Sequence, residues 1–118
     1  MLSTALQIPA FGIDNLILTT TGVPTPGPHE VLVDLRFASL NFRDLMTVLG
    51  TYNPKMPLPR VPGSDGAGIV TAIGDQVTQF KVGDRVTSIF FQSWQDGEIQ
   101  PSTGKSALRL FSFIHSGL

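Results

Sequence analysis

Cysteine, histidine and carboxylate side chains are the usual ligands of catalytic zinc, so their number and spacing decide whether this chain could hold a metal. A catalytic zinc ion takes about three protein ligands of these types. The chain has no cysteine and only two histidines, His29 and His115, which lie far apart in the sequence. Because this ligand set is incomplete, we predict no metal site and interpret His29 as a solvated loop residue.

Serine and glycine residues could support hydrolase or phosphate-binding chemistry only in particular motifs. Ser64 lacks the G-x-S-x-G setting of a hydrolase nucleophile. The glycines of residues 63–68 fall in the order G-x-x-G-x-G and precede a predicted strand, whereas a dinucleotide fingerprint must open a helix. The sequence at 104–106 is GKS, but a phosphate loop requires a glycine where this chain has Ile99. We therefore expect neither a hydrolase nor a phosphate cradle in this chain.

Three other polar side chains surround one predicted helix. Asn41 stands at its N-cap position, and Asp44 follows at the third helical position, where a carboxylate favours the positive end of the helix dipole. Gly50 is predicted to end the helix, and Tyr52 follows in a proline-rich loop. The amphipathic helix itself is indicated by apolar residues at i, i+3, i+4 and i+7, namely Phe42, Leu45, Met46 and Leu49.

The elements that would position these side chains are mostly predicted strands. Alternation over 30–40 places Val31, Val33, Leu35 and Phe37 on one face, with Asp34 and Arg36 on the other. The glycine-rich bend at 62–68 precedes a strand over 69–73, a Gly-Asp turn and a further strand over 86–91. Shorter strands are predicted at 5–8 and 15–20, joined by a hairpin-type turn at 11–14. The composition of one 118-residue domain, with 42% hydrophobic residues, suits a single globular core.

Several motifs in this order resemble a known family. PGSDGAGIV followed by GDQVTQFKVGDRV, with PTPGPHEVLV and SLNFRDLMTVLGTYNP upstream, is similar to the N-terminal, GroES-like catalytic domain of medium-chain dehydrogenases/reductases. The likeness covers roughly residues 5 to 95 and is strongest for the zinc-free branch that includes the quinone oxidoreductases. It implies a mainly β fold over residues 1–108, a partly open, GroES-like barrel with a short helix. Residues 109–118 depart from the family pattern, and we therefore expect the chain to lack the Rossmann domain that follows in the family.

The resemblance also implies roles for the polar residues. The Asn that matches Asn41 lies at the interdomain cleft and bonds the nicotinamide end of the cofactor, and Asp44 matches an acid that accompanies it. Tyr52 matches a Tyr that borders the substrate pocket. Helix capping for Asn41 and Asp44, and plain packing for Tyr52, are the alternative roles. Zinc-dependent members have Cys at the position of Asn41 and His-Glu at Ser64 and Asp65; here we expect these two to close the bend through side-chain-to-backbone bonds.

The net charge and the hydropathy of the chain indicate which classes of partner it lacks. A net charge of -1 and the lack of a basic stripe argue against nucleic acid. Without a signal peptide or an apolar run of membrane-spanning length, the sequence predicts a cytoplasmic protein with no membrane partner.

The function that the resemblance implies is the catalytic domain of an NAD(P)H-dependent, zinc-independent oxidoreductase that reduces a small quinone, enone or carbonyl substrate. NADPH or NADH would be bound mainly by the missing domain, so the chain alone is expected to be inactive. Because an interdomain surface would then be exposed, self-association is also expected. The alternative is a non-enzymatic interaction module that retains only the barrel.

Overall fold

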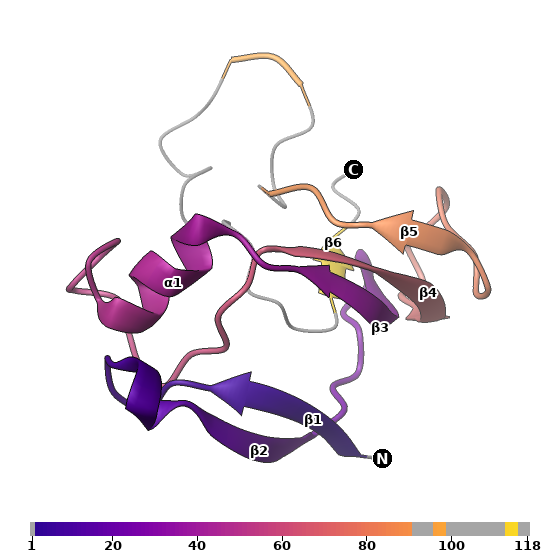
Figure 1. The fold of residues 1–118 in the computed structure, drawn as a ribbon. Helices are drawn as coiled ribbons and strands as arrows, with labels where there is room; N and C mark the ends of the chain where they lie inside the picture. Colours follow the sequence, from indigo (N-terminus) through magenta and orange to yellow (C-terminus); the bar gives the residue numbers. More distant parts are fainter. Residues whose placement is uncertain (1, 91–95, 99–112, 116–118) are drawn as a thin grey trace.

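The computed structural model describes residues 2–90, 96–98 and 113–115 of the 118-residue chain. Its elements form two sheets, an antiparallel pair β1-β2 and a four-stranded sheet in the order β5-β4-β3-β6 (Figure 1). The bounds are β1 Leu2–Gln7, η1 Ile13–Asn15, β2 Ile17–Gly22, β3 Glu30–Ser39, α1 Phe42–Leu49, β4 Asp65–Ile73, β5 Arg85–Thr87 and β6 Phe113–His115. The prediction of a mainly β, open GroES-like fold with one short helix is confirmed.

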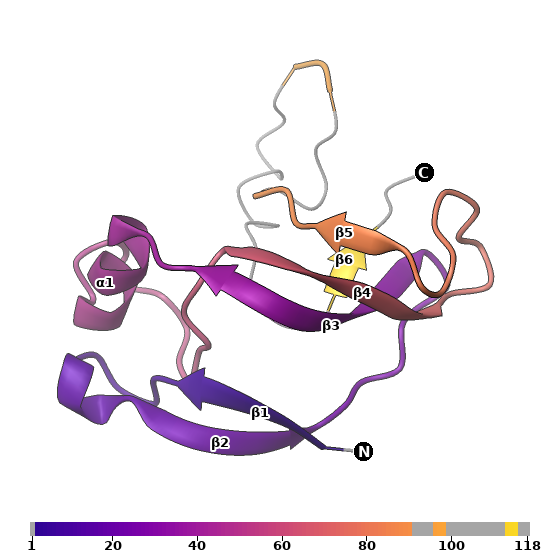
Figure 2. The same cartoon turned by 45° about the vertical axis from the view of Figure 1, so that its right-hand side comes forward.

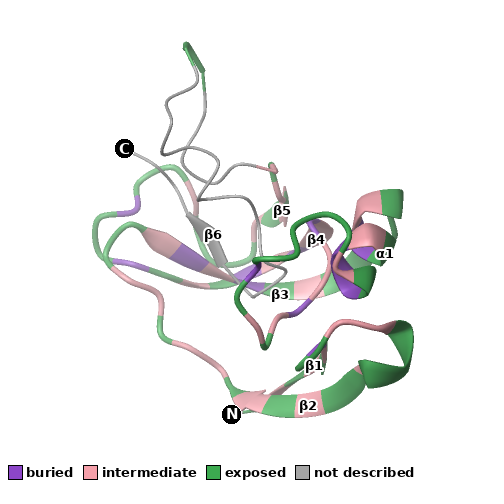
Figure 3. Cartoon of the chain, turned by 90° about the vertical axis from the view of Figure 1, so that its left-hand side faces the viewer, coloured by how far each residue is buried: buried purple, intermediate pink, exposed green. Residues whose placement is uncertain are grey.

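The core lies on one face of the β3–β4 pair. These strands are antiparallel, and four buried valines from β3, β4 and the turn after β4 form its centre: Val31, Val33, Val70 and Val77. Figure 3 shows the buried segments of this sheet beside exposed outer residues. Burial of a valine side chain stabilises the fold by roughly 1.5–3 kcal/mol before its entropy cost, so this small cluster is the main apolar contribution of the sheet.

The predicted alternation of β3 holds only for its first half. Val31 and Val33 are 0% and 2% exposed, but Phe37 is 76% exposed, so its assignment to the core face was wrong. The reason is an irregularity in register between Leu35 and Phe37, where β3 carries one more residue than β4. A bulge of this kind changes the side-chain alternation beyond it.

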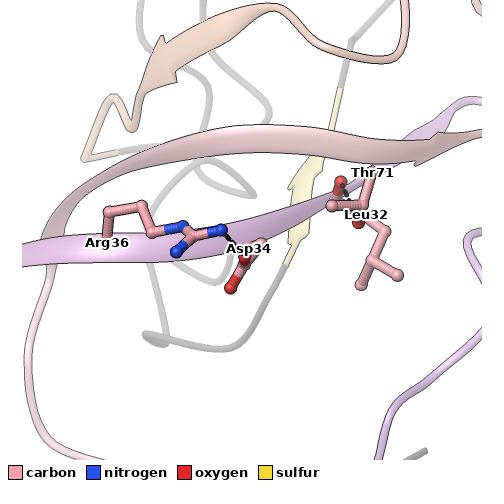
Figure 4. Close-up of polar contacts among 4 residues, drawn as sticks. All are labelled: Leu32, Asp34, Arg36 and Thr71. Atoms are coloured by element: carbon pink, nitrogen blue, oxygen red, sulfur yellow. Dashed lines mark hydrogen bonds and ion pairs between the residues drawn. The ribbon is translucent and has the colours of Figure 1, made fainter.

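The outer face of β3 carries the predicted polar residues. Arg36 and Asp34 are both exposed and form an ion pair of 2.7 Å between Nη2 and Oδ2 (Figure 4). On the neighbouring strand, the Thr71 hydroxyl donates to the Leu32 carbonyl at 3.3 Å. Such an exposed ion pair contributes only about 0–1 kcal/mol to the stability of the fold. It shows that this face of the sheet is exposed to solvent, but it does little to stabilise the sheet.

The N-terminal hairpin is present, but its strands have other bounds than the sequence predicted: β1 begins earlier than 5, and β2 is shifted from 15–20 to 17–22. β1 and β2 pair over six residues each, from Leu2 opposite Gly22 to Gln7 opposite Ile17, and the short helix η1 extends one residue beyond the predicted turn at 11–14. Figures 1 and 2 show this hairpin as a separate layer beside the four-stranded sheet. Ile8 leaves β1 and exchanges two backbone hydrogen bonds with Arg60, of 2.8 and 3.0 Å. That bridge attaches the hairpin to the loop between α1 and β4.

The last strands differ in part from the prediction. β5 covers Arg85–Thr87, shorter than the predicted strand over 86–91, whose last residue lies outside the described residues. In the tail, β6 pairs antiparallel with the start of β3, and the rest of 109–118 lies outside the described residues. The domain boundary at 108 stays a prediction. Within the described ranges, no helix has the length and apolar character needed to cross a membrane.

Candidate functional site

The start of α1 brings two of the predicted site residues beside a third polar group. Ser39 ends β3 opposite Asp65, which begins β4, so Asn41 follows directly beside Asp65. The Asn41 amide Nδ2 donates to Asp65 Oδ2 at 2.6 Å, with Ser39 Oγ at 3.4 Å as a weaker partner. The amide of Asn41 is therefore held by a carboxylate from the neighbouring strand, a contact that the sequence did not predict.

Asp44 closes the first turn of the helix. Its Oδ2 accepts the Asn41 backbone N–H at 2.8 Å, and the two residues have the capping-box arrangement. The side chain is buried, with a relative exposure of 7%, and its Oδ1 has no hydrogen-bond partner among the described residues. The capping role is thus present in the structure. A direct contact of Asp44 with a cofactor stays a prediction.

The helix bounds were predicted well, but its orientation was not evident from the sequence. α1 covers Phe42–Leu49, and Gly50 ends it at φ 78° as expected. The side that packs inward carries Asp44, Thr47 and Val48. Most of the apolar face faces outward, with three exposed residues that we call the α1 apolar stripe: Phe42, Leu45 and Leu49.

Contacts at the C-terminal half of α1 explain this orientation. The backbone N–H of Gly12 donates to the Val48 carbonyl at 2.8 Å, and Gly50 packs against the ring of Phe11. A side chain at Gly50 would meet that ring, so the loop at 11–12 must lie directly on the helix end. The hairpin connection therefore occupies the inner side of α1, and the stripe remains outside.

Tyr52 lies in the loop after α1. Its backbone N–H donates to the Met46 carbonyl at 3.2 Å, and its side chain is half-exposed. The ring centroid is 4.5 Å from Cζ of Arg43, and the centroid of Phe90 is 4.7 Å from the same atom. An eight-residue helix is about 12 Å long, so Asn41 and Tyr52 lie at opposite ends of α1. Arg43 connects these ends, and sequence reasoning missed it; that it is the only basic residue of the helix was the available signal.

The positions that the resemblance matches to zinc ligands make contacts within the protein. Asp65 accepts the Asn41 amide, and Ser64 is buried at 2% exposure. Among the described residues, no three His, Cys, Asp or Glu side chains form a group that could hold an ion. The bend is closed differently from our expectation, because Ser88 Oγ accepts the Gly66 N–H at 3.1 Å and donates to the Ser64 carbonyl at 3.4 Å. The side chain that bonds the backbone of the bend therefore comes from Ser88, directly after β5.

Together, the open β-sheet, the capped helix and the glycine-rich bend leading into β4 define a GroES-like domain. The family profile of the alcohol dehydrogenase GroES-like domain matches residues 27–110. The chain therefore belongs to this family, within the medium-chain dehydrogenase/reductase superfamily of oxidoreductases.

Individual relatives agree with this assignment. The chain is 45% identical over 98 residues to a zinc-type alcohol dehydrogenase-like protein from Schizosaccharomyces pombe, an alignment covering 82% of this chain and 28% of that protein. It is 37% identical over 87 residues to a quinone oxidoreductase from Lama guanicoe, covering 72% and 26%. The solved quinone oxidoreductase of Pseudomonas syringae superposes with a TM-score of 0.65 at 40% identity, covering 71% and 26%. The chain thus spans less than a third of the length of these relatives.

Proposed function

We propose that this chain is the catalytic-domain portion of an NAD(P)H-dependent, zinc-independent oxidoreductase that reduces a quinone, an enone or another activated carbonyl. The observation that carries the proposal is the Asn41 amide, held at the start of α1 by the 2.6 Å hydrogen bond to Asp65. It stands where zinc-type relatives have a ligand cysteine, and it offers a neutral amide suited to hydrogen bonding with a carboxamide. The kinship with proteins named quinone oxidoreductase supports the same choice.

In this proposal four residues of the candidate site have defined roles. The nicotinamide cofactor, when bound, supplies the hydride, so no side chain of this chain needs to be a nucleophile. Asn41 orients the nicotinamide end, and Asp65 fixes the direction of its amide by accepting one N–H. Asp44 fixes the backbone that carries Asn41. Tyr52 forms a wall that orients the substrate and excludes water. The expected cytoplasmic location also stays a prediction.

The first test is a titration of the 15N-labelled chain with NADPH, followed by NMR. We expect the side-chain amide resonance of Asn41 to shift without saturation below about 1 mM, because the sequence has no phosphate cradle of its own. Asn41→Ala should remove the accompanying shifts in the backbone at the start of α1. Asn53→Ala, which changes an exposed loop residue, is the matched control and should leave them unchanged.

Either of two results would contradict the proposal. Saturation at about 1 μM would show that the chain holds the whole dinucleotide by itself, against the assignment of a catalytic portion. A titration in which Asn41 never moves, while other residues do, would remove it from the cofactor site.

The second candidate function is an interaction module that keeps only the GroES-like domain. The observation that favours it is the α1 apolar stripe, whose residues Phe42, Leu45 and Leu49 are 75%, 41% and 47% exposed. Leu40, which precedes the helix, is 93% exposed. Apolar side chains gathered on one element commonly mark a contact surface. If NADPH moves no resonance near Asn41 while the stripe still binds a macromolecule, the module is the better description.

Both candidates predict self-association of the isolated chain through the stripe. We expect the weight-average mass in sedimentation equilibrium to rise above the monomer mass of 12.7 kDa as the concentration increases. Leu45→Lys should return it to the monomer value, because a charge in an apolar contact is left without a partner. Leu18→Lys is the control, since Leu18 is 72% exposed on β2, away from the stripe. A wild-type chain that stays monomeric at high concentration would contradict the prediction.

A further inference from the structure

Arg43 lies two residues after Asn41 in α1 and contacts Tyr52, and neither the sequence motifs nor the family resemblance assigned it a role. It contacts two aromatic rings at once, Tyr52 in the loop after α1 and Phe90 after β5. A guanidinium group is planar and weakly hydrated, so it packs well against aromatic faces. The contact therefore joins two segments that are distant in the chain and that border the same helix.

The environment of Arg43 differs from that of an ordinary surface arginine. Its Nε is buried and has no hydrogen-bond partner among the described residues. The adjacent carboxylate of Asp44 is turned to the Asn41 backbone. Arg36, in contrast, is exposed and paired with Asp34 (Figure 4). Because no carboxylate pairs with Arg43 among the described residues, the two rings are what orient its guanidinium.

Tyr52 in turn depends on this contact. Its backbone N–H donates to the Met46 carbonyl at 3.2 Å, which fixes the backbone but not the direction of the ring. The ring is 46% exposed, so packing alone restricts it only in part. The guanidinium of Arg43, 4.5 Å from the ring centroid, is the charged group that fixes its direction.

We propose that Arg43 is a positioning residue, which uses Phe90 as a support to hold the Tyr52 ring beside α1. That the Tyr52 ring then forms a wall for the substrate rests on the proposed function. The positioning itself does not, because it concerns only the contact of Arg43 with two rings of this chain.

NMR of the 118-residue chain tests the positioning directly, since Tyr52 is its only tyrosine and gives one set of ring signals. In the wild type we expect nuclear Overhauser contacts between the Arg43 side chain and the Tyr52 ring, and ring-current shifts of the Arg43 Hδ protons. Arg43→Met should remove the charge and move the Tyr52 ring signals toward those of an unstructured peptide. Arg43→Lys keeps the charge without the planar group and should rescue them only in part.

Two further variants keep the result interpretable. Arg36→Met removes an exposed arginine on β3, which pairs with Asp34, and should leave Tyr52 unchanged. Phe90→Leu leaves Arg43 and Tyr52 intact, yet should move the Tyr52 ring signals because the support of the guanidinium is lost. Backbone signals of Val31, Val33 and Val70 report in each variant whether the core is still folded.

The inference is overturned if Tyr52 gives the same ring signals in Arg43→Met, Phe90→Leu and the wild type, with the core folded. It is also overturned if the wild type lacks the contacts between Arg43 and Tyr52. Adding a soluble quinone separates the two proposals. If the Arg43 contacts are present but no quinone moves Tyr52, the proposed substrate wall fails while the positioning stands.

Discussion

Gly74→Ala is expected to destabilise the domain by about 3 kcal/mol or more, a large part of the roughly 5–15 kcal/mol that keeps a typical domain folded. Gly74 follows β4, and a Cβ atom placed there would overlap the backbone carbonyl groups of Gly27 and Pro28. Backbone cannot move aside as a flexible side chain can. In the native structure the Gly74 N–H donates to the Glu30 carbonyl at 2.8 Å, and the Gln76 N–H donates to Pro28 at 2.9 Å. One added methyl group therefore pushes Gly74 away from the segment at 27–30 and disturbs the hydrogen bonds between them.

Gly22→Ala is the matched control for this prediction. Gly22 ends β2, and a Cβ atom there meets nothing within 4 Å. Its backbone is not in the left-handed region, so alanine should be neutral or stabilise the fold by up to about 1 kcal/mol through a lower entropy of the unfolded chain. Urea unfolding of both variants measures the difference. Equal midpoints would show that the connection before β3 does not lie against Gly74.

Features that depend on neighbouring residues could be predicted from the sequence, whereas features that depend on contacts between distant segments could not. The bounds of α1 follow from local chemistry, because Asn41 and Asp44 cap its start and Gly50 permits the left-handed residue that ends it. Such signals lie within one turn of the positions they determine. The start of β4 is not local in this sense: the strand was predicted over 69–73, but β4 begins at Asp65, because residues 65–68 of the predicted bend pair with β3.

Features that depend on two distant segments were not predictable from one sequence. The contact between Asn41 and Asp65 depends on the β3–β4 register, and the exposure of Phe37 depends on a bulge in that register. The outward direction of the α1 apolar stripe depends on Gly12 binding the helix end. Periodicity identifies an apolar face, but it does not say which surface will cover that face. In the candidate site, the helix cap at Asn41 and Asp44 could therefore be predicted from nearby residues. The contact of Arg43 with Phe90 could not, because it joins distant segments.

Ile8→Ala should be the second most damaging substitution, with a loss of about 3 kcal/mol in the free energy of unfolding. Ile8 is fully buried, with 0% exposure, although it belongs to neither sheet. Its two backbone hydrogen bonds with Arg60 are the described link between the hairpin and the loop that precedes β4. Loss of the side chain leaves a cavity at this junction, because neighbouring atoms relax only partly into the space.

The location of Ile8 makes a second, local effect expected beside the global one. Hydrogen exchange at the amides of Ile8 and Arg60 should accelerate more than exchange at Val31 and Val70, since opening at the junction need not open the sheet. Ile17→Ala is the control, because Ile17 is 46% exposed on β2 and should cost under about 1 kcal/mol. If the two alanine variants unfold at the same urea concentration, Ile8 does not anchor the hairpin.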